Sequence, residues 1–395
     1  MSSHPVFCIV AGEPSGDLLG SFLMKSLKEI FPAAQFVGVG GPLMEACGLS
    51  TLFPIQELSV IGITEIIPKA WGILKKVSLV AKFVHEQKVD ALITIDAPAF
   101  SFRVGRALRR LEKKSAEKTI HIHYVAPTVW AWRPKRSKKI AKFLTHLLTL
   151  FSFEPPYFLK EGLPATFVGH PVLQGQYDEG DEKRFRAEHL IPKTMPLICM
   201  LPGSRMSEVH RHLPVFLEAL KKLYEKSPKF GVIIPTLGHL KEVLHKLLQK
   251  ERLPFPVIVV EGEGQKRDAF AASRCALAAS GTVALELSCA GLPMIIAYRT
   301  SALTAFIVRL MIKIPFVSMP NILLGRRVVP ELIQEKCRAD LLCDELKSLL
   351  GDVRIRNLQK EAFFEVKEKL SPSEDLSPSL FAAKTIQNIM KRKSS

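Results

Sequence analysis

Short apolar runs alternate with longer amphipathic stretches along most of this chain. An apolar run of about four to eight residues is typical of a buried strand, whereas apolar residues that recur every three or four positions predict a helix. Predicted strands cover 7–11, 36–40, 91–95, 119–125, 147–151, 196–200, 231–235, 256–260, 275–279 and 293–297. Because helical patterns separate the strands, the chain is predicted to form parallel sheets with right-handed crossovers, an α/β fold.

The length and one polar interval divide the chain into two α/β domains. A chain of 395 residues is long enough for two domains of ordinary size. The interval 177–184 is polar, charged and glycine-bearing, and we expect the linker there. The predicted domains are therefore 1–180 and 185–345.

The end of the chain is predicted to be helical. Beyond Pro330 the pattern predicts helices only, interrupted by a Ser- and Pro-rich stretch at 370–379 and closed by a basic helix at 380–392. We therefore assign 346–395 to a separate helical segment. The sequence leaves open whether the last helix packs back on the first domain.

A glycine-bearing turn follows the predicted strand at 196–200. Leu201-Pro-Gly-Ser-Arg205 separates that strand from a helical pattern. Gly203 allows the backbone to approach a ligand, and the helix start, with Ser204, offers free N–H groups. Arg205 supplies a fork of donors suited to phosphate. These features predict an anion site, although an ordinary strand–helix turn with a surface arginine has the same sequence.

A second turn of small residues follows the predicted strand at 275–279. Ser280, Gly281 and Thr282 precede a helix, and Glu286 lies one helical turn further on. Backbone amides there would hold a diphosphate, and the carboxylate would accept hydrogen bonds from a ribose diol. The alternative is a plain N-cap with Glu286 on a solvated face. Two such turns in one half of the chain favour a nucleotide site.

Polar residues also stand where strands of the first half end. Glu13, Ser15 and Asp17 follow the first predicted strand, and Asp96 follows the strand at 91–95. In open α/β sheets ligands bind at the carboxyl ends of strands, where a carboxylate can act as a general base. A cap on the next helix is an equally consistent role for Asp96.

The charge balance narrows the class of partner. There are 55 Lys and Arg against 38 Asp and Glu, a net charge of +17, which favours a phosphorylated substrate, an anionic membrane or nucleic acid. The seven cysteines form no C-x-x-C pair, which indicates neither zinc nor a disulfide framework and fits a reducing cytosol. No acidic pair at metal spacing stands beside the two turns, so we expect no metal.

Neither a signal peptide nor a membrane span is expected. Residues 1–10 lack a basic region and lead directly into a strand. The most hydrophobic long run, 302–317, is interrupted by Arg309 and Lys313 and is too short to cross a bilayer.

A helix predicted over 68–87 carries apolar residues beyond its core stripe. Trp71, Leu79 and Phe83 lie off the stripe, and lysines surround it. The pattern fits a core helix with a few exposed apolar residues, and it also fits a helix that touches a membrane.

Several segments, taken in order, resemble those of the lipid-A-disaccharide synthase family. They are Ala11-Gly-Glu-Pro-Ser-Gly-Asp17, Ile95-Asp-Ala-Pro98, Tyr124-Val-Ala-Pro-Thr-Val-Trp-Ala-Trp-Arg133, Leu201-Pro-Gly-Ser-Arg205, Ser280-Gly-Thr-Val-Ala-Leu-Glu286 and Pro320-Asn321. The first and third are highly specific in combination, whereas the two turns recur in other nucleotide-sugar enzymes. The likeness runs from about residue 8 to residue 345.

The resemblance implies a glycosyltransferase type B fold, with two Rossmann-like domains and a cleft between them. It implies an inverting enzyme of lipid A biosynthesis in a Gram-negative bacterium. Such an enzyme joins UDP-2,3-diacylglucosamine to 2,3-diacylglucosamine 1-phosphate (lipid X) and releases UDP, with no further cofactor. The family's functional Glu, Asp, Arg and Asn fall on Glu13, Asp96, Arg205 and Asn321.

The resemblance also implies where the enzyme works. The donor belongs in the second domain, the acceptor in the first, and the enzyme on the cytoplasmic face of the inner membrane. Membrane contact is then favoured for residues around Ile66, Trp71, Ile73, Leu74 and Leu79. A homodimer is left open. Pro14 and Ala126 depart from the Thr and Ser that we expect in the family, but neither departure removes a charge.

Two other functions compete with this prediction. A UDP-N-acetylglucosamine 2-epimerase, or another type B enzyme, would share the fold and the Ser-Gly-Thr turn but lack the Trp-Ala-Trp-Arg run. A basic nucleic-acid-binding protein would need a basic stripe interleaved with aromatic residues. No recognisable nucleic-acid fold accompanies the basic cluster at 133–142, so we expect no nucleic-acid partner.

Overall fold

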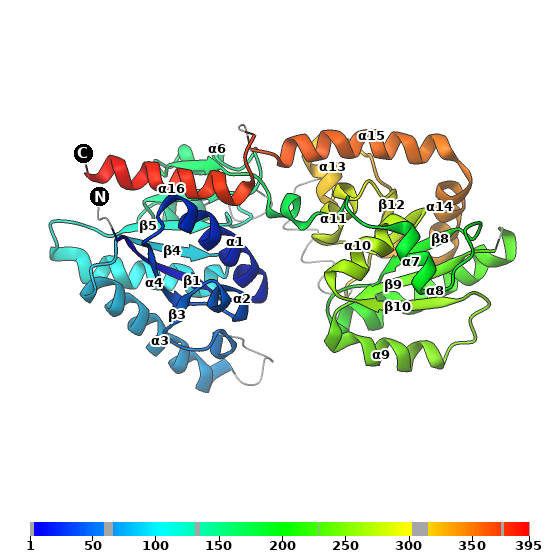
Figure 1. Ribbon diagram of the computed structural model, residues 1–395, viewed down its shortest axis with the longest axis horizontal. Helices are drawn as coiled ribbons and strands as arrows, with labels where there is room; N and C mark the ends of the chain where they lie inside the picture. Colours follow the sequence, from blue (N-terminus) through cyan, green and yellow to red (C-terminus); the bar gives the residue numbers. More distant parts are fainter. Residues whose placement is uncertain are drawn as a thin grey trace. The chain divides into compact units, whose positions relative to one another are not determined.

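The computed structural model describes residues 4–58, 66–130, 135–227, 229–301, 315–372 and 375–394. They form two compact units. The first comprises Met1–Pro171 with Leu370–Ser395, and the second comprises Val172–Lys369. Figure 1 shows a sheet flanked by helices in each of them. Within the described ranges, no helix is both long and apolar enough to pass through a bilayer.

The first unit contains a parallel sheet of seven strands in the order β3-β2-β1-β4-β5-β6-β7. Its strands are β1 (Val6–Ala11), β2 (Gln35–Val39), β3 (Leu49–Thr51), β4 (Ala91–Ile95), β5 (Ile120–Tyr124), β6 (His146–Thr149) and β7 (Ala165–Phe167). Its helices are α1 (Pro14–Ile30), α2 (Pro42–Ala46), η1 (Ile55–Leu58), α3 (Ile66–Glu86), α4 (Pro98–Leu111), η3 (Glu112–Lys114), α5 (Arg136–Ile140), α6 (Pro156–Leu159) and α16 (Pro378–Ser394).

The second unit contains a parallel sheet of six strands in the order β10-β9-β8-β11-β12-β13. Its strands are β8 (Leu197–Leu201), β9 (Gly231–Thr236), β10 (Val257–Glu261), β11 (Cys275–Ala279), β12 (Met294–Tyr298) and β13 (Glu331–Ile333). Its helices are η4 (Pro171–Gly175), α7 (Glu182–Glu188), α8 (Met206–Lys226), α9 (Gly238–Gln249), α10 (Glu263–Ala272), α11 (Val283–Cys289), α13 (Met319–Leu324), η5 (Gln334–Lys336), α14 (Ala339–Gly351) and α15 (Val353–Leu370).

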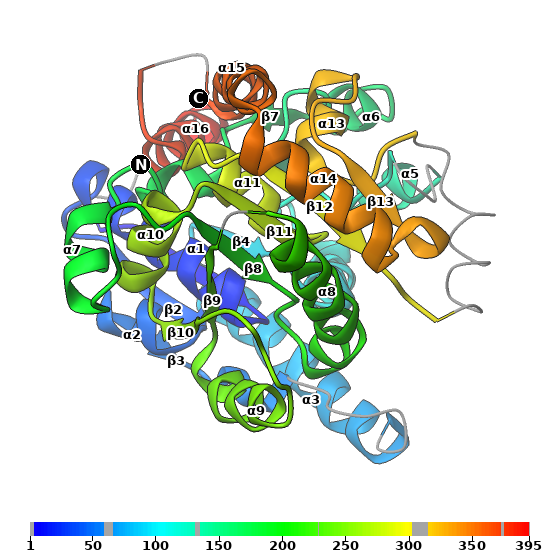
Figure 2. The same cartoon turned by 90° about the vertical axis from the view of Figure 1, so that its right-hand side faces the viewer.

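Alternate residues of the central strands explain why both faces of each sheet are covered. Phe7 and Ile9 of β1 pack in the core under α1 and α16, whereas Cys8 and Val10 pack against α3 and α4. Successive strand residues point to opposite faces, so an apolar run without alternation needs helices on both sides. Figure 2 shows the equivalent covering in the second unit, where α8 and α14 lie side by side.

Every strand predicted above is present, with ends shifted by at most a residue or two. The predicted chain of helices beyond Pro330 is wrong at one point, because Glu331–Ile333 forms β13 and pairs with β12. Three short edge strands, β3, β7 and β13, were not predicted from the sequence. Each has only three residues, too few for a periodicity to register.

The polar interval 177–184 packs within the second unit, and the units divide at Pro171 instead. Asp181 caps α7 by accepting a hydrogen bond from the Arg184 N–H at 2.9 Å. The Arg184 guanidinium in turn binds Asp268 at 2.7 Å. Asp181 and Arg184, two of the charges in this interval, are therefore engaged within the second unit.

The last helix belongs to the first unit. Ala382, Ala383 and Ile386 of α16 are fully buried in the core that α1 shares with the sheet. The Ser26 hydroxyl of α1 donates to the Ser379 hydroxyl of α16 at 3.0 Å. By contrast, α14 and most of α15 belong to the second unit.

Candidate active site

A cavity of about 640 Å³ opens at the carboxyl edge of the second sheet. It lies where the strand order reverses between β8 and β11, the usual ligand position in a doubly wound sheet. Every residue that the sequence assigned to the diphosphate and ribose lines it: Gly203, Ser204, Arg205, Ser280, Gly281, Thr282 and Glu286. Two turns 77 residues apart in the chain (203 to 280) thus border one cavity.

The turn after β8 is built around glycine. Gly203 has φ +138°, and a Cβ there would lie 2.4 Å from the Cβ of Glu208. Glu208 accepts a hydrogen bond from the Ser204 N–H at 3.0 Å and lies 3.4 Å from an Arg205 nitrogen. The Arg205 side chain is 77% exposed, so this long contact leaves its guanidinium available to a ligand.

Sequence reasoning missed Lys266, which lines the same cavity from α10. Its ammonium nitrogen lies 2.7 Å from Glu286 Oε2. Burial lowers the pKa of Lys266, but Glu286 and Glu263 more than offset this, and the pKa lies above its ordinary value. The signal was its position, because a helix that follows β10 starts at the same edge of the sheet as the two glycine-bearing turns.

The first unit has its own point of strand reversal, between β1 and β4. The register Ala11↔Ile95 places the turns that carry Glu13 and Asp96 side by side. Gly12 permits this approach, because a Cβ at that position would lie 2.5 Å from the Cβ of Ala97. Glu13 is exposed and Asp96 is half-buried.

The backbone at Asp96 is held in an unusual conformation. Asp96 has φ +47° and Ala97 has φ +43°, a region that costs non-glycine residues about 1–3 kcal/mol each. The Asp96 N–H donates to Tyr124 O at 2.9 Å, and Asp96 O accepts from the Ser101 hydroxyl at 2.7 Å. Burial raises the pKa of the Asp96 carboxyl above the ordinary aspartate value, against the lowering by a hydrogen bond from the backbone of Ala97.

Asp17 and Ser15 do not share the position of Glu13. Asp17 is buried and accepts hydrogen bonds from the N–H groups of Gly41, Leu43 and Met44, which satisfies the first turn of α2. Ser15 is exposed on the first turn of α1. Of the two carboxylates after β1, Glu13 is therefore the one that remains exposed.

Asn321 is fully buried and does not line the cavity in the second unit. Its amide nitrogen donates to Val329 O and to Glu331 Oε1, and its amide oxygen accepts from the N–H groups of Val328 and Val329. These four bonds use the ordinary capacity of an asparagine amide. In this structure Asn321 therefore holds the segment before β13.

Glu154 is another residue that the sequence did not mark. It follows β6 at the carboxyl edge of the first sheet and is 2% exposed. Its carboxylate accepts from Trp130 Nε1 at 3.2 Å and from the Leu150 and Phe151 N–H groups. Burial raises the pKa of Glu154 to about 7, against the lowering by these hydrogen bonds. Trp132 and Arg133, which follow Trp130 in the motif, lie outside the described residues.

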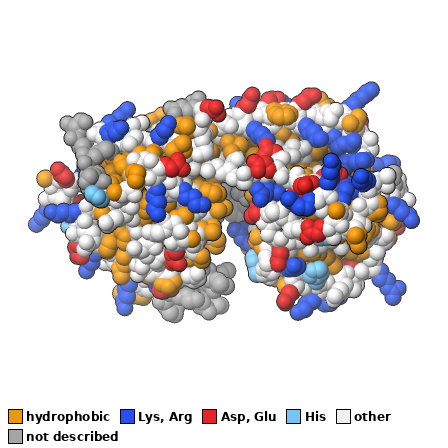
Figure 3. Space-filling model, viewed as in Figure 1, with side chains coloured by type: hydrophobic (Ala, Val, Ile, Leu, Met, Phe, Trp, Pro, Cys, Tyr) orange, Lys and Arg blue, Asp and Glu red, His pale blue; other side chains and the backbone are white. Residues whose placement is uncertain are grey.

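The helix α3 presents apolar groups to solvent. Trp71 is 72% exposed, Leu74 51% and Leu79 46%, whereas Ile73 packs partly against the core. The side chain of Ile66 lies outside the described residues, as does most of the run 302–317. Figure 3 shows Lys and Arg side chains spread over both units.

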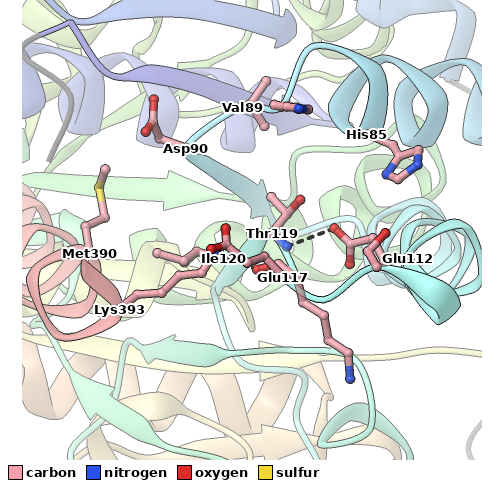
Figure 4. Close-up of a pocket in the computed structure, with 12 residues that line it drawn as sticks. His85, Val89, Asp90, Glu112, Glu117, Thr119, Ile120, Met390 and Lys393 are labelled. Carbon is pink, nitrogen blue, oxygen red and sulfur yellow. Dashed lines mark hydrogen bonds between the residues drawn. The ribbon is translucent and has the colours of Figure 1, made fainter. Parts of the chain in front are cut away.

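A second cavity, of about 520 Å³, lies at the opposite, amino edge of the first sheet. Figure 4 shows Glu112 bonded to the Thr119 N–H there. Asp90 accepts from the Val6 N–H, and Lys393 donates to Lys118 O. These side chains are hydrogen-bonded to backbone groups of their own unit, and they lie at the edge opposite to that of Glu13 and Asp96. We therefore assign this cavity no part in the site.

Comparison with known proteins decides the family. The sequence profile of one protein family, described as lipid-A-disaccharide synthetase, matches residues 7–385. The lipid-A-disaccharide synthase of Rhodospirillum centenum is 44% identical over 386 residues, which cover 98% of this chain and 94% of the relative. The chain belongs to the lipid-A-disaccharide synthase family. The lipid-A-disaccharide synthase of Rickettsia typhi is 38% identical over 96% of this chain and 97% of its own. The predicted enzyme class, a glycosyltransferase of lipid A biosynthesis, is confirmed.

Solved structures confirm the predicted fold class. MurG of Acinetobacter baumannii superposes with a TM-score of 0.60 at 15% identity, covering 98% of this chain and 99% of its own. A UDP co-structure of MnaA from S. aureus gives a TM-score of 0.63 at 14% identity, covering 98% and 96%. At such identities the likeness shows the fold alone, which is the glycosyltransferase type B fold of two Rossmann-like domains. The epimerase alternative shares that fold at 13% identity, whereas the synthase family profile matches residues 7–385 of the sequence. The sequence match therefore favours the synthase family over the epimerase alternative.

Proposed function

We propose that this enzyme transfers diacylglucosamine from UDP-2,3-diacylglucosamine to the 6-hydroxyl of 2,3-diacylglucosamine 1-phosphate. The products are the β-1′,6-linked lipid A disaccharide 1-phosphate and UDP. The observation that carries the proposal is the cavity in the second unit, where the residues expected to bind a nucleotide diphosphate meet. Membership of the family supports the choice of both sugars.

The proposed roles follow from chemistry at the two sheet edges. The donor's UDP binds in the second unit at Gly203, Ser204 and the Ser280–Thr282 turn, with the ribose at Glu286. The acceptor binds the first unit at the ends of β1 and β4. Asp96 removes the proton of the acceptor hydroxyl, which then displaces UDP directly, so the α-linked donor gives a β-linked product in one inversion. Glu13 orients the acceptor or the base, and Arg205 offsets charge on the departing diphosphate.

Product analysis tests this proposal. The purified full-length enzyme is incubated with UDP-diacylglucosamine and lipid X, and the products are examined by mass spectrometry. We expect the mass of a tetraacylated disaccharide 1-phosphate together with an equimolar amount of UDP. UDP release that does not depend on lipid X, or isomerised UDP-sugar without a disaccharide, would contradict the proposal.

We also propose that α3 carries the enzyme to the cytoplasmic face of the inner membrane. Trp71, Leu74 and Leu79 expose apolar surface, and Lys75 and Lys82 are exposed beside them. Such a face enters the boundary of a bilayer while its lysines meet anionic headgroups. Acylated, phosphorylated substrates reside in that layer, which accounts for both the apolar residues and the positive net charge.

The membrane proposal predicts a loss of binding on replacement of two apolar residues. In liposome sedimentation with anionic vesicles, Trp71→Ser/Leu79→Ser should lower the partition coefficient by about tenfold or more, because two side chains no longer leave water. Binding of the parent should weaken with salt. The control, Leu190→Ser/Phe364→Ser, removes one aliphatic and one aromatic exposed side chain from the second unit. If Trp71→Ser/Leu79→Ser pelleted with the vesicles as fully as the parent does, α3 would be ruled out as the contact surface.

A further inference from the structure

Glu286 enters the cavity of the second unit already held by two side chains from elsewhere in the fold. Lys266 Nζ from α10 lies 2.7 Å from Glu286 Oε2. Tyr177, which precedes α7, lies near the same carboxylate, and burial together with Glu286 raises the pKa of the tyrosine. The Lys266 ammonium lies 5.2 Å from the centre of the Tyr177 ring. The three side chains thus form one contiguous group, of which Glu286 and Lys266 line the cavity.

The carboxylate retains capacity for a further donor. Glu286 Oε2 is buried and lies against the Lys266 ammonium, which engages this oxygen as an ion pair. A carboxylate has about four acceptor positions, and buried polar atoms are almost always hydrogen-bonded. The Glu286 side chain as a whole remains 16% exposed on the cavity wall, so the accessible part of the carboxylate can accept a hydrogen bond from a ligand hydroxyl.

Lys266 is better placed to orient Glu286 than to serve as a free cation for phosphate. Its side chain is 20% exposed, and its ammonium also approaches Glu263 Oε1 at 3.4 Å. Two carboxylates therefore surround this lysine. Arg205, at the other wall, is 77% exposed and remains the available cation for the diphosphate.

We propose that Lys266, with Tyr177, is a positioning residue that fixes Glu286 to accept hydrogen bonds from the ribose diol of the donor nucleotide. This inference rests on the proposed UDP site and goes beyond it, since it makes recognition of a ribonucleotide depend on a lysine outside both glycine-bearing turns. This clamp of Lys266 and Tyr177 sets the direction in which the carboxylate faces, and the ribose hydroxyls donate to the part of the carboxylate that remains accessible.

The test compares UDP with 2′-deoxy-UDP and 3′-deoxy-UDP by calorimetry on the full-length enzyme. A hydrogen bond to a charged group predicts that the parent prefers UDP over at least one analogue by about tenfold or more. Glu286→Gln and Lys266→Met should each bring that ratio close to one, and the double variant should lower it no further. Lys266→Arg should keep most of the preference. Tyr177→Phe should reduce it in part, and provides a second route if Lys266→Met does not fold.

Lys221→Met is the matched control, because Lys221 pairs with Glu251 at 2.6 Å and the same charge is removed from the same unit away from the cavity. It should leave the ratio unchanged. If Lys266→Met weakens UDP and the deoxy analogues equally, or leaves all affinities unchanged, the clamp is overturned. If the parent binds UDP and both deoxy analogues with equal affinity, Glu286 does not recognise the ribose hydroxyls. The proposed role of Lys266 and Tyr177 is then wrong as well. Failure of the parent to bind UDP overturns the proposed function itself.

Discussion

Asp96→Asn should lower kcat by about a hundred- to ten-thousand-fold while UDP affinity stays near that of the parent. The acceptor's primary hydroxyl is a poor nucleophile until a base removes its proton, and general bases contribute on that order. Asparagine keeps the shape of the side chain and loses its basicity. UDP binds the second unit in our proposal, so a change in the first unit should leave its affinity unaffected.

The pH profile gives this prediction a second readout. A base must be deprotonated to act, so kcat falls as pH drops through its pKa. Burial raises the pKa of Asp96, and the acid limb of the profile should therefore lie above the pH of about 4 expected for an ordinary aspartate. The residual activity of Asp96→Asn should lack that limb.

Glu13→Gln is the matched comparison, because it makes the same carboxylate-to-amide change on the neighbouring turn. We expect a smaller loss of kcat for it than for Asp96→Asn, since Glu13 is assigned to orientation. If Asp96→Asn turns over near the parental rate and Glu13→Gln does not, the two roles are reversed. If both variants turned over at the parental rate, neither Asp96 nor Glu13 would be the general base.

Structural features that depend on residues close together in the sequence could be predicted well. A fully buried parallel strand such as β4 reads as a continuous apolar run because helices cover both of its faces. Once the strands are known, the residues at their carboxyl ends follow, which is how Asp96, Gly203 and Ser280 were found. The order of strands then brings two turns of each unit together at its point of reversal.

Features that depend on partners far away in the chain were not predicted. Lys266 lies in an ordinary charged helix, and its pairing with Glu286 has no pattern in the sequence. Glu154 is distinguished by its burial and by the hydrogen bond that it accepts from Trp130, and neither the burial nor this pairing has a local sequence pattern. Asn321, carried over from the family motif, has an amide whose four hydrogen bonds lie within its own unit. No local pattern distinguishes such an asparagine from one that awaits a substrate.

Arg205→Ala should lower kcat by about a hundred- to a thousand-fold and weaken UDP binding by much less. In the ground state the UDP diphosphate is already surrounded by backbone amides of two turns, as we propose. Negative charge grows on the leaving oxygen only as the sugar–phosphate bond breaks, and a donor aimed there stabilises the transition state more than the bound substrate. The exposed, loosely tethered guanidinium can reach that charge when the donor is in place.

The measurement is kcat and KM together with the Kd of UDP for the parent, Arg205→Ala and Arg205→Lys. Lysine restores the charge without the fork, so it should recover part of the lost rate. Arg327→Ala removes an exposed arginine of the same unit, which lies 3.9 Å from Glu345, and should change neither constant. A variant Arg205→Ala with parental kcat and a raised KM would mean that Arg205 binds ground state and transition state equally. Its proposed role at the departing diphosphate would then be wrong.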